Sequence, residues 1–204
     1  MSPIPRVVGA DPVVGQVLSD AFARDPFMEW IFGRSAVAES LPTWWGWLVA
    51  NAPEGAEVWG TDDGGAAALW YPPRHAGDPV PERVLDRADK GAAAPFVEML
   101  TPLVGDRIGE ILTLFAAGGE AHPPEPHWYL SALGTRRDRQ GQGLGALLVH
   151  PMIDRCDDDG LGIYLESSNP RNIPFYHRLG FEVVGELSTP DNAVMLTGML
   201  RAAR

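Results

Sequence analysis

A glycine-rich stretch between a predicted strand and a predicted helix restricts the fold of this chain more than any other feature. Trp128–Thr135 alternates in the manner of a β-strand, and Gly143–Asp159 has apolar residues at helical spacing before Gly160 ends it. The stretch between them reads Arg-Gln-Gly-Gln-Gly-Leu-Gly at positions 139–145. A strand that turns directly into a helix is a unit of an α/β layer, so we expect a fold of that class.

Further helices and strands are expected on both sides of this unit. Asp11–Phe22 is a predicted helix with Asp11 as its N-cap, and Asp25-Pro26 interrupts the pattern because a residue before proline avoids the helical region. Pro151 is expected to kink the helix 143–159. The other predicted helices are Ala36–Asn51, Pro81–Asp89, Ala94–Val104, Arg107–Ala116 and a short one between Asn169 and Gly180. The other predicted strands are Glu57–Gly60, Ala66–Tyr71, Gly162–Glu166, Phe181–Leu187 and Ala193–Arg201, with loops at Arg74–Glu82 and Gly118–Pro126.

The length and composition indicate one domain over residues 1–204 with a sizeable core, since 45% of the residues are hydrophobic. No apolar run approaches the roughly 18 to 20 residues of a membrane span, so no membrane partner is expected. Residues 1–9 lack the basic and apolar regions of a signal peptide. The single cysteine, Cys156, has no partner for an internal disulfide. These features together predict a cytoplasmic protein.

The charge distribution excludes one class of partner and favours another. The net charge of −11 repels nucleic acid phosphates, so a nucleic-acid binder is not expected. The same charge suits a cationic amine, although solubility alone also explains it. Within this acidic chain Arg136, Arg137 and Arg139 stand together, which indicates a defined anionic ligand near the glycines.

The glycine stretch has the properties of a phosphate site. Glycines let backbone approach a ligand closely, and the N–H groups and positive dipole end of the following helix point into the loop. A Walker loop is excluded because no Lys follows, and a dinucleotide fingerprint because Gly145 comes one residue early. A tight strand-to-helix turn that binds nothing remains the alternative.

The spacing Q-x-x-G-x-G from Gln140 to Gly145 resembles the acyl-CoA pyrophosphate loop of GCN5-related N-acetyltransferases (GNAT). His127–Thr135, Tyr164–Ser168 and Asn169–Phe181 are similar to the strands and helix around that loop in the family, most of all in its puromycin N-acetyltransferase members. The resemblance covers roughly residues 13–200 and is looser in the first half. It implies a single domain whose mixed, mostly antiparallel sheet has splayed parallel strands and flanking helices. Residues 127–187 would form the acyl-CoA core, and the N-terminal part the acceptor side.

The resemblance also implies acetyl-CoA as the cofactor and direct transfer to an amine in a ternary complex. Tyr176 matches the family's general acid, although the sequence without this resemblance favours a core tyrosine. Glu166 is the candidate base, with a structural hydrogen-bonding role as the alternative. No metal site is expected, and His127, His150 and Cys156 are not expected to act in catalysis. The cofactor-binding candidates are Leu133, Gly134, Thr135, Arg139, Gln140, Gly141, Gln142, Gly143, Leu144, Gly145, Ala146, Asn172 and Tyr176.

These observations predict an N-acetyltransferase that acts on a primary amine of a small molecule. The alternatives are a peptide or protein N-terminal acetyltransferase and a catalytically silent acyl-CoA-binding sensory module. A closed aromatic pocket would favour the small molecule, and an open groove the peptide. The candidate pocket walls are Phe27, Trp30, Trp44, Trp45, Trp70 and Tyr71, each of which also suits the core. Asn172 could cap a helix as well as contact the cofactor. Arg136 and Arg137 could bind the cofactor's 3′-phosphate or only cap the turn. The sequence leaves the oligomeric state open, and a homodimer is among the alternatives.

Overall fold

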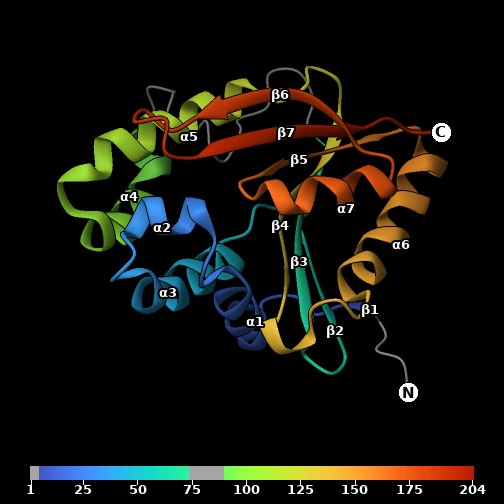
Figure 1. The fold of residues 1–204 in the computed structure, drawn as a ribbon, viewed down its shortest axis with the longest axis horizontal. Coiled ribbons are helices and arrows are strands. Elements are labelled where there is room, and N and C mark those ends of the chain that lie inside the picture. Colours follow the sequence, from blue (N-terminus) through green and yellow to red (C-terminus); the bar gives the residue numbers. More distant parts are fainter. Residues whose placement is uncertain (1–4, 74–89) are drawn as a thin grey trace.

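A twisted seven-stranded sheet organises the part of the chain that the computed structural model describes, residues 5–73 and 90–204 (Figure 1). The strand order is β1-β2-β3-β4-β5-β7-β6, and the pair β4–β5 is parallel while the other pairs are antiparallel. The predicted fold class is therefore confirmed. The strands are β1 (Pro5–Val7), β2 (Glu57–Thr61), β3 (Ala66–Tyr71), β4 (His127–Thr135), β5 (Gly162–Ser167), β6 (Glu182–Ser188) and β7 (Met195–Arg201).

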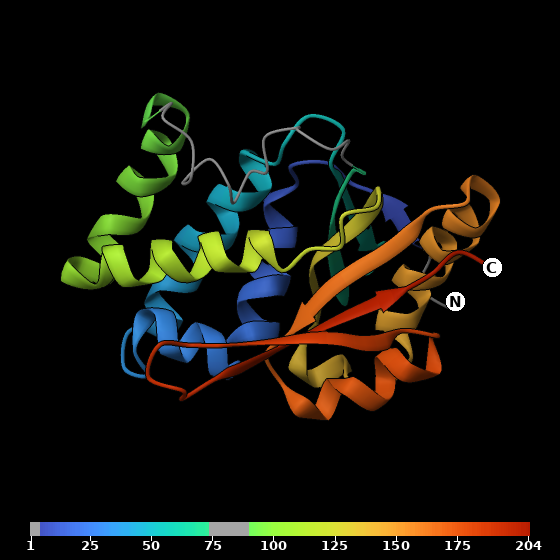
Figure 2. The same ribbon diagram turned by 90° about the horizontal axis from the view of Figure 1, so that it is seen from above.

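Helices cover both faces of the sheet (Figures 1 and 2). One face carries α1 (Pro12–Phe22), α2 (Pro26–Phe32), α3 (Val37–Ala50), α4 (Lys90–Val104) and α5 (Ile108–Glu120). The other carries α6 (Leu144–Asp159) and α7 (Ile173–Arg178). Among the described residues, three 3₁₀ turns join elements: η2 (Gly105–Arg107), η3 (Arg137–Arg139) and η4 (Pro170–Asn172). Within the described ranges, no helix has the length and apolar character that a membrane crossing requires.

Strand β3 divides the core in two. All six of its residues are buried, because the sheet has helices on both faces at this strand. Ala67, Leu69 and Tyr71 pack in the cluster beneath α1–α5, and Ala66, Ala68 and Trp70 pack in the cluster beneath α6 and α7. The alternation follows from the two-residue period of a strand. The same alternation in β4 points Tyr129 toward the α1–α5 side and buries Trp128 and Leu130 beneath α6. It is reversed later in the strand, where Ala132 packs in the α1–α5 cluster and Leu133 packs on the α6 side.

Most predicted elements are confirmed, including the break at Asp25-Pro26; one helix was missed and one predicted loop has a wrong bound. Asp25 does more than end a helix: its Oδ1 accepts hydrogen bonds from the N–H groups of Phe27 and Met28, both at 3.0 Å, and so begins α2, which was not predicted. The predicted loop at 118–126 starts too early, since α5 continues to Glu120. Helix α6 continues through Pro151. The predicted loop at 74–82 and helix at 81–89 lie outside the described residues.

A buried ion pair fastens the end of α6 to β7, and its loss should be measurable. Arg201, whose side chain is 5% exposed, donates from both terminal nitrogens to the carboxylate oxygens of Asp157 at 2.7 Å. Replacing Asp157 by Asn should lower the free energy of unfolding by about 2 kcal/mol, because a guanidinium is left buried without its carboxylate. Chemical denaturation measures the loss, and Asp158→Asn, at an exposed neighbour, is the matched control. Equal stability of both variants would contradict this account.

The same pair predicts an acid-dependent loss of stability. The hydrogen bonds from Arg201 lower the pKa of Asp157 to about 2. A depressed carboxyl pKa contributes stability above the unfolded value of about 3.9, and that contribution disappears as the pH falls toward 2. The difference between the wild type and Asp157→Asn should therefore shrink across this acidic window.

Candidate active site

Strands β4 and β5 pair at one end only and then separate. Their pairing covers three positions, from His127 opposite Gly162 to Tyr129 opposite Tyr164. Beyond this point β4 stays with β3 as far as Thr135, and β5 stays with β7 as far as Ser167. The two strands therefore diverge, as the predicted fold requires, and we call the region between them the slot.

A bulge on β4 lies just past the point of divergence. Leu69 of β3 is opposite Ala132 and Trp70 is opposite Leu130, so Ser131 is an extra residue on β4. Bulges turn a strand and redirect a side chain, and they are frequent beside active sites. Here Ser131 faces the cavity described below.

The glycine loop leads from the far end of β4 into α6 through a left-handed backbone. Gly141 and Gly143 have φ of +75° and +81°, values that glycine adopts without strain. A Cβ at either position would meet nothing within 4 Å. Gly143 is the N-cap of α6, and no side chain hydrogen-bonds to this end of the helix. The open loop and the N–H groups of the first helical turn therefore fit a diphosphate.

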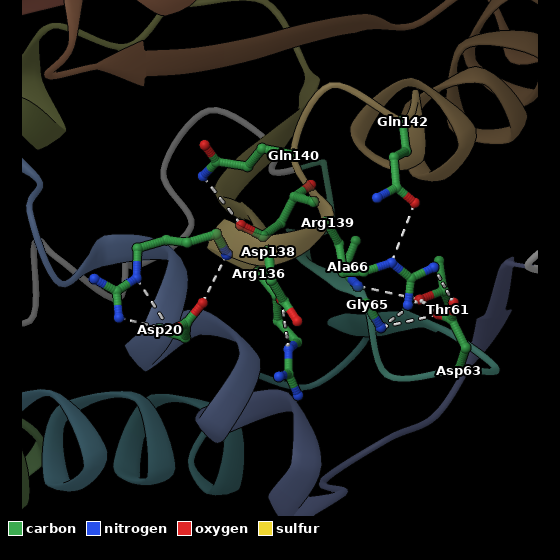
Figure 3. A network of polar contacts seen from close by, with 12 residues as sticks. Asp20, Thr61, Asp63, Gly65, Ala66, Arg136, Asp138, Arg139, Gln140 and Gln142 are labelled. Atoms are coloured by element: carbon green, nitrogen blue, oxygen red, sulfur yellow. Dashed lines mark hydrogen bonds and ion pairs between the residues drawn. The ribbon is translucent and has the colours of Figure 1, made fainter.

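The arginines around this loop hold the turn in place (Figure 3). Arg137 donates to Asp20 of α1 at 3.1 Å through its side chain and at 2.7 Å through its backbone N–H. Arg139 donates to Asp63 at 2.6 Å and to Gln142 at 3.1 Å. The backbone N–H of Arg137 lowers the pKa of Asp20, so the carboxylate stays charged.

Arg136 in turn pairs with Asp138 at 3.2 Å. The contacts of Arg136 and Arg137 fix the turn, and a contact with the cofactor's 3′-phosphate stays a prediction. Gln140 also acts within the turn, because its side-chain amide donates to the carbonyl oxygen of Thr135 at 3.3 Å.

The remaining cofactor-binding candidates, at the end of β4 and the start of α6, lie next to one another around the slot. Leu133, Gly134 and Thr135 end β4, and Leu144, Gly145 and Ala146 form the first turn of α6. Gly134 also has a packing role, since a Cβ there would come within 2.8 Å of Ala21 on α1. The side chain of Leu144 is buried in the core, so this residue offers a ligand its backbone N–H.

Asn172 is exposed at the start of α7, and its side chain makes no capping hydrogen bond. Asn172 therefore occupies the predicted N-cap position of α7 without a side-chain cap, whereas Asn169 caps the preceding 3₁₀ turn by accepting a hydrogen bond from the N–H of Arg171 at 3.1 Å. The contact between Asn172 and the cofactor stays a prediction.

Tyr176 lies on α7 with its side chain enclosed. It is 8% exposed and its ring packs against those of Phe175 and Phe181, with centroids 5.0 and 5.8 Å away. Burial, and to a smaller extent the charge of Asp25, raises the pKa of the Tyr176 phenol. The hydroxyl is therefore a proton donor over the whole physiological range.

A cavity of about 320 Å³ lies on the α1–α5 side of the slot. Its aromatic walls include Phe27, Trp44, Trp45, Trp47, Tyr71, Phe96 and Phe115. Trp30 and Trp70, two of the predicted walls, are elsewhere: Trp30 stacks with Arg107 and donates to Asp191, and Trp70 is fully buried beneath α6. Trp47, Phe96 and Phe115 were not predicted, because helical spacing does not reveal which of several helices close around one space.

Two carboxylates line this cavity among the described residues, Asp25 and Glu166. Asp25 caps α2 through Oδ1 and accepts a hydrogen bond from Ser168 through Oδ2 at 2.6 Å. Burial raises the pKa of Asp25. The Asp-Pro pair marked Asp25 as a helix boundary. No local pattern indicated that Ser168, 143 positions later in the chain, would be its hydrogen-bond partner in this site.

Two histidines lie behind Glu166. His122 Nε2 is 3.5 Å from Glu166 Oε1, and His122 Nδ1 is 3.1 Å from His127 Nε2. His127 Nδ1 is 2.7 Å from the carbonyl oxygen of Glu125. No sequence pattern singled out His122, and His127 was not expected to take part in catalysis; only the fold brings His122 to Glu166 and His127 to His122.

Two other chemistries find little support. Cys156 is fully buried, and desolvation raises the pKa of its thiol to about 12, so it does not supply a thiolate. No group of three or more metal-ligating side chains suited to a metal ion occurs in residues 5–73 and 90–204.

Known proteins resemble this chain in sequence and in structure. A model of the acetyltransferase (GNAT) family matches residues 74–181, just over half of the chain. An uncharacterized N-acetyltransferase of Schizosaccharomyces pombe is 44% identical over 54 residues, which are 26% of this chain and 22% of that protein. An L-methionine sulfoximine/L-methionine sulfone acetyltransferase of Pseudomonas paraeruginosa is 32% identical over 90 residues, 42% of this chain and 52% of that protein. The matches thus span about half or less of these relatives.

The solved structure of a histone acetyltransferase HPA2 and related acetyltransferase from Corynebacterium glutamicum superposes with a TM-score of 0.70 and 24% identity, covering 100% of this chain and 98% of that one. At this level of identity the likeness concerns the fold.

Proposed function

Because the family model covers more than half of its residues, the chain belongs to the acetyltransferase (GNAT) family, and we propose that it transfers an acetyl group from acetyl-CoA to a primary amine of a small molecule. The glycine loop and the first turn of α6 would hold the diphosphate of acetyl-CoA, and the slot between β4 and β5 its pantetheine arm. When bound there, acetyl-CoA supplies an activated thioester. The enzyme's contribution is chiefly to position the amine beside it.

One observation carries this proposal: the cavity opens onto the place where the two strands separate. Tyr129 and Ser131 belong to β4, Glu166 belongs to β5, and all three line the cavity. An amine in the cavity would therefore face the slot from the side opposite the loop helix. We assign Glu166 the role of base for the amine proton and Tyr176 the role of acid for the departing thiolate.

The walls of the cavity favour an aromatic monoamine as the acceptor. Its carboxylates, Asp25 and Glu166, sit with Ser168 and Ser131 near the slot, and aromatic rings from α3, α4 and α5 form much of the remainder. A second cationic group, as in a polyamine, would be desolvated against these rings without an opposite charge. A volume of about 320 Å³ suits a small molecule better than an extended peptide.

A panel of amines tests the proposal. With acetyl-CoA, 2-phenylethylamine and tryptamine should release free thiol with a kcat/KM at least about tenfold above that of spermidine, since spermidine would have to bury its two further cationic groups. Mass spectrometry identifies the acetylated amine. Faster acetylation of peptide N-termini would favour the peptide acetyltransferase instead. Binding of CoA without transfer to any amine would favour the silent acyl-CoA-binding module.

A further inference from the structure

The turn between β2 and β3 (residues 62–65) lies beside the glycine loop and is tied to it at two places (Figure 3). The backbone N–H of Arg136 donates to the carbonyl oxygen of Gly65 at 2.9 Å. The guanidinium of Arg139 donates to Asp63 Oδ2 at 2.6 Å. The loop that is expected to receive the diphosphate therefore rests on a turn from a different part of the chain, 76 positions before Arg139 in the case of Asp63.

The contact with Asp63 continues to the middle of the glycine loop. While Arg139 donates through Nη2 to Asp63, it also donates through Nε to Gln142 Oε1 at 3.1 Å. Gln142 lies between Gly141 and Gly143, which both have positive φ. Glycine loses more conformational freedom on ordering than any other residue, so a Gly-Gln-Gly segment benefits from a restraint on its central residue. The Asp63–Arg139–Gln142 row supplies such a restraint.

Asp63 is itself fixed from within the turn. Its Oδ1 accepts hydrogen bonds from Thr61 Oγ1 at 2.7 Å and from the N–H of Gly65 at 2.9 Å. Thr61 is buried, and its hydroxyl oxygen also accepts from the N–H groups of Gly65 and Ala66 at 2.9 and 3.1 Å. The hydrogen bond from Thr61, and to a smaller extent that from Arg139, lowers the pKa of Asp63, so the carboxylate stays charged. One carboxylate oxygen thus serves the turn and the other serves Arg139.

An arginine beside a diphosphate site can bind the ligand directly or hold the loop that binds it. The guanidinium of Arg139 is engaged on two sides, and moving it to a phosphate would break a charge-assisted hydrogen bond of 2.6 Å. We propose that Asp63 is a positioning residue for acetyl-CoA, which acts through Arg139 to hold Gln142 and its flanking glycines in place before the ligand binds. A loop that is ordered in advance loses less conformational entropy on binding. The inference rests on the proposed role of the glycine loop.

The variant Asp63→Asn separates the two roles of this carboxylate. An asparagine keeps an acceptor for Thr61 and Gly65, but it places an amide donor where Arg139 needs an acceptor. The side chains of Arg139 and Asp63 are 32% and 31% exposed. For a pair exposed to this extent we expect the Kd for CoA, measured by calorimetry, to rise about fivefold.

Asp158→Asn, which removes the same charge at an exposed position of α6, is the matched control. It should bind CoA as tightly as the wild type, and its thermal stability should be close to that of Asp63→Asn. If Arg139 instead contacted the ligand directly, releasing it from Asp63 would leave the Kd for CoA unchanged or lower it. Either result would overturn the proposal.

A double-mutant cycle tests whether Asp63 acts through Arg139. Arg139→Ala should also weaken CoA binding, and the double variant with Asp63→Asn should have the same Kd as Arg139→Ala alone. The two losses are not expected to add, because either substitution breaks the same row. Additive losses would contradict the proposal, since Asp63 would then affect the ligand by a separate route.

A measurement without ligand separates this inference from the proposed function. In the ligand-free protein, the NMR order parameter of the Gln142 backbone amide should be lower in Asp63→Asn than in the wild type and unchanged in Asp158→Asn. An equal order parameter in all three proteins would refute the positioning role. A wild type that binds CoA but acetylates no amine would reject acetyl transfer and leave the role of Asp63 intact. A wild type that binds no CoA would overturn the role of the loop, and this inference with it.

Discussion

Replacing Tyr176 by Phe should lower kcat about 100-fold and leave the Kd for CoA nearly unchanged. The variant removes one hydroxyl group, and general acids contribute on the order of 10² to 10⁴ in rate. The conjugate acid of a thiolate leaving group has a pKa of ~8.5, so a thiolate depends less on protonation for its departure than an alkoxide does. The lower end of the range therefore applies. Steady-state kinetics with 2-phenylethylamine and calorimetric titration with CoA measure the two quantities.

The environment of Tyr176 also predicts how kcat depends on pH. Burial and the charge of Asp25 raise the pKa of the phenol, so the acid stays protonated as the pH increases. Up to pH 9, the kcat of the wild type should therefore fall no more steeply than the kcat of the Tyr176→Phe variant. An unchanged kcat in the variant, with thermal stability equal to that of the wild type, would remove Tyr176 from the mechanism and leave it as a core tyrosine against Phe175 and Phe181.

Replacing Gly143 by Ala should weaken CoA binding more than tenfold. The residue has φ of +81°, and an added Cβ would point into open space at the start of α6, where the diphosphate is expected. A side chain there would keep the ligand from the N–H groups of the first helical turn. The left-handed backbone also costs about 1 kcal/mol of stability when the residue is not glycine.

The two ends of α6 provide a matched pair of variants. Gly160, the C-cap of the same helix, has φ of +69°, and a Cβ there would likewise meet nothing within 4 Å. Gly160→Ala should therefore lose a similar amount of stability in thermal denaturation while retaining wild-type affinity for CoA in calorimetry. Equal affinities in the two variants would mean that the open loop at Gly143 does not receive the ligand.

The pattern of local residues was enough to predict the glycine loop and its flanking elements. Periodicity marked β4 and α6, and three glycines at alternate positions indicated a loop whose backbone a ligand can approach closely; in the structure Gly141 and Gly143 have positive φ. The same kind of argument was correct but incomplete at Asp25-Pro26. Asp25 is extended, as expected of a residue before proline, but proline is also favoured at the first position of a helix, and Asp25 caps α2 there.

The composition of the cavity was only partly predictable. Aromatic residues were abundant in the first half of the chain, but each suited the core as well as a binding site. Trp70 faces α6 whereas its neighbour Tyr71 faces the cavity, because successive residues of a strand point to opposite sides. Which side carries the cavity depends on where α3, α4 and α5 pack, and no local pattern specifies that.

The sequence by itself determined the elements, the glycine loop and the family resemblance, because each depends on residues close together in the chain: a period, a cap or a glycine. Tertiary structure alone decided which side chains meet at the slot. Ser168 reaches Asp25 across 143 positions, and His122 reaches Glu166 from the loop after α5. Such contacts are set by strand register and by the divergence of β4 from β5, and these follow from how the whole sheet and its helices pack rather than from any short segment.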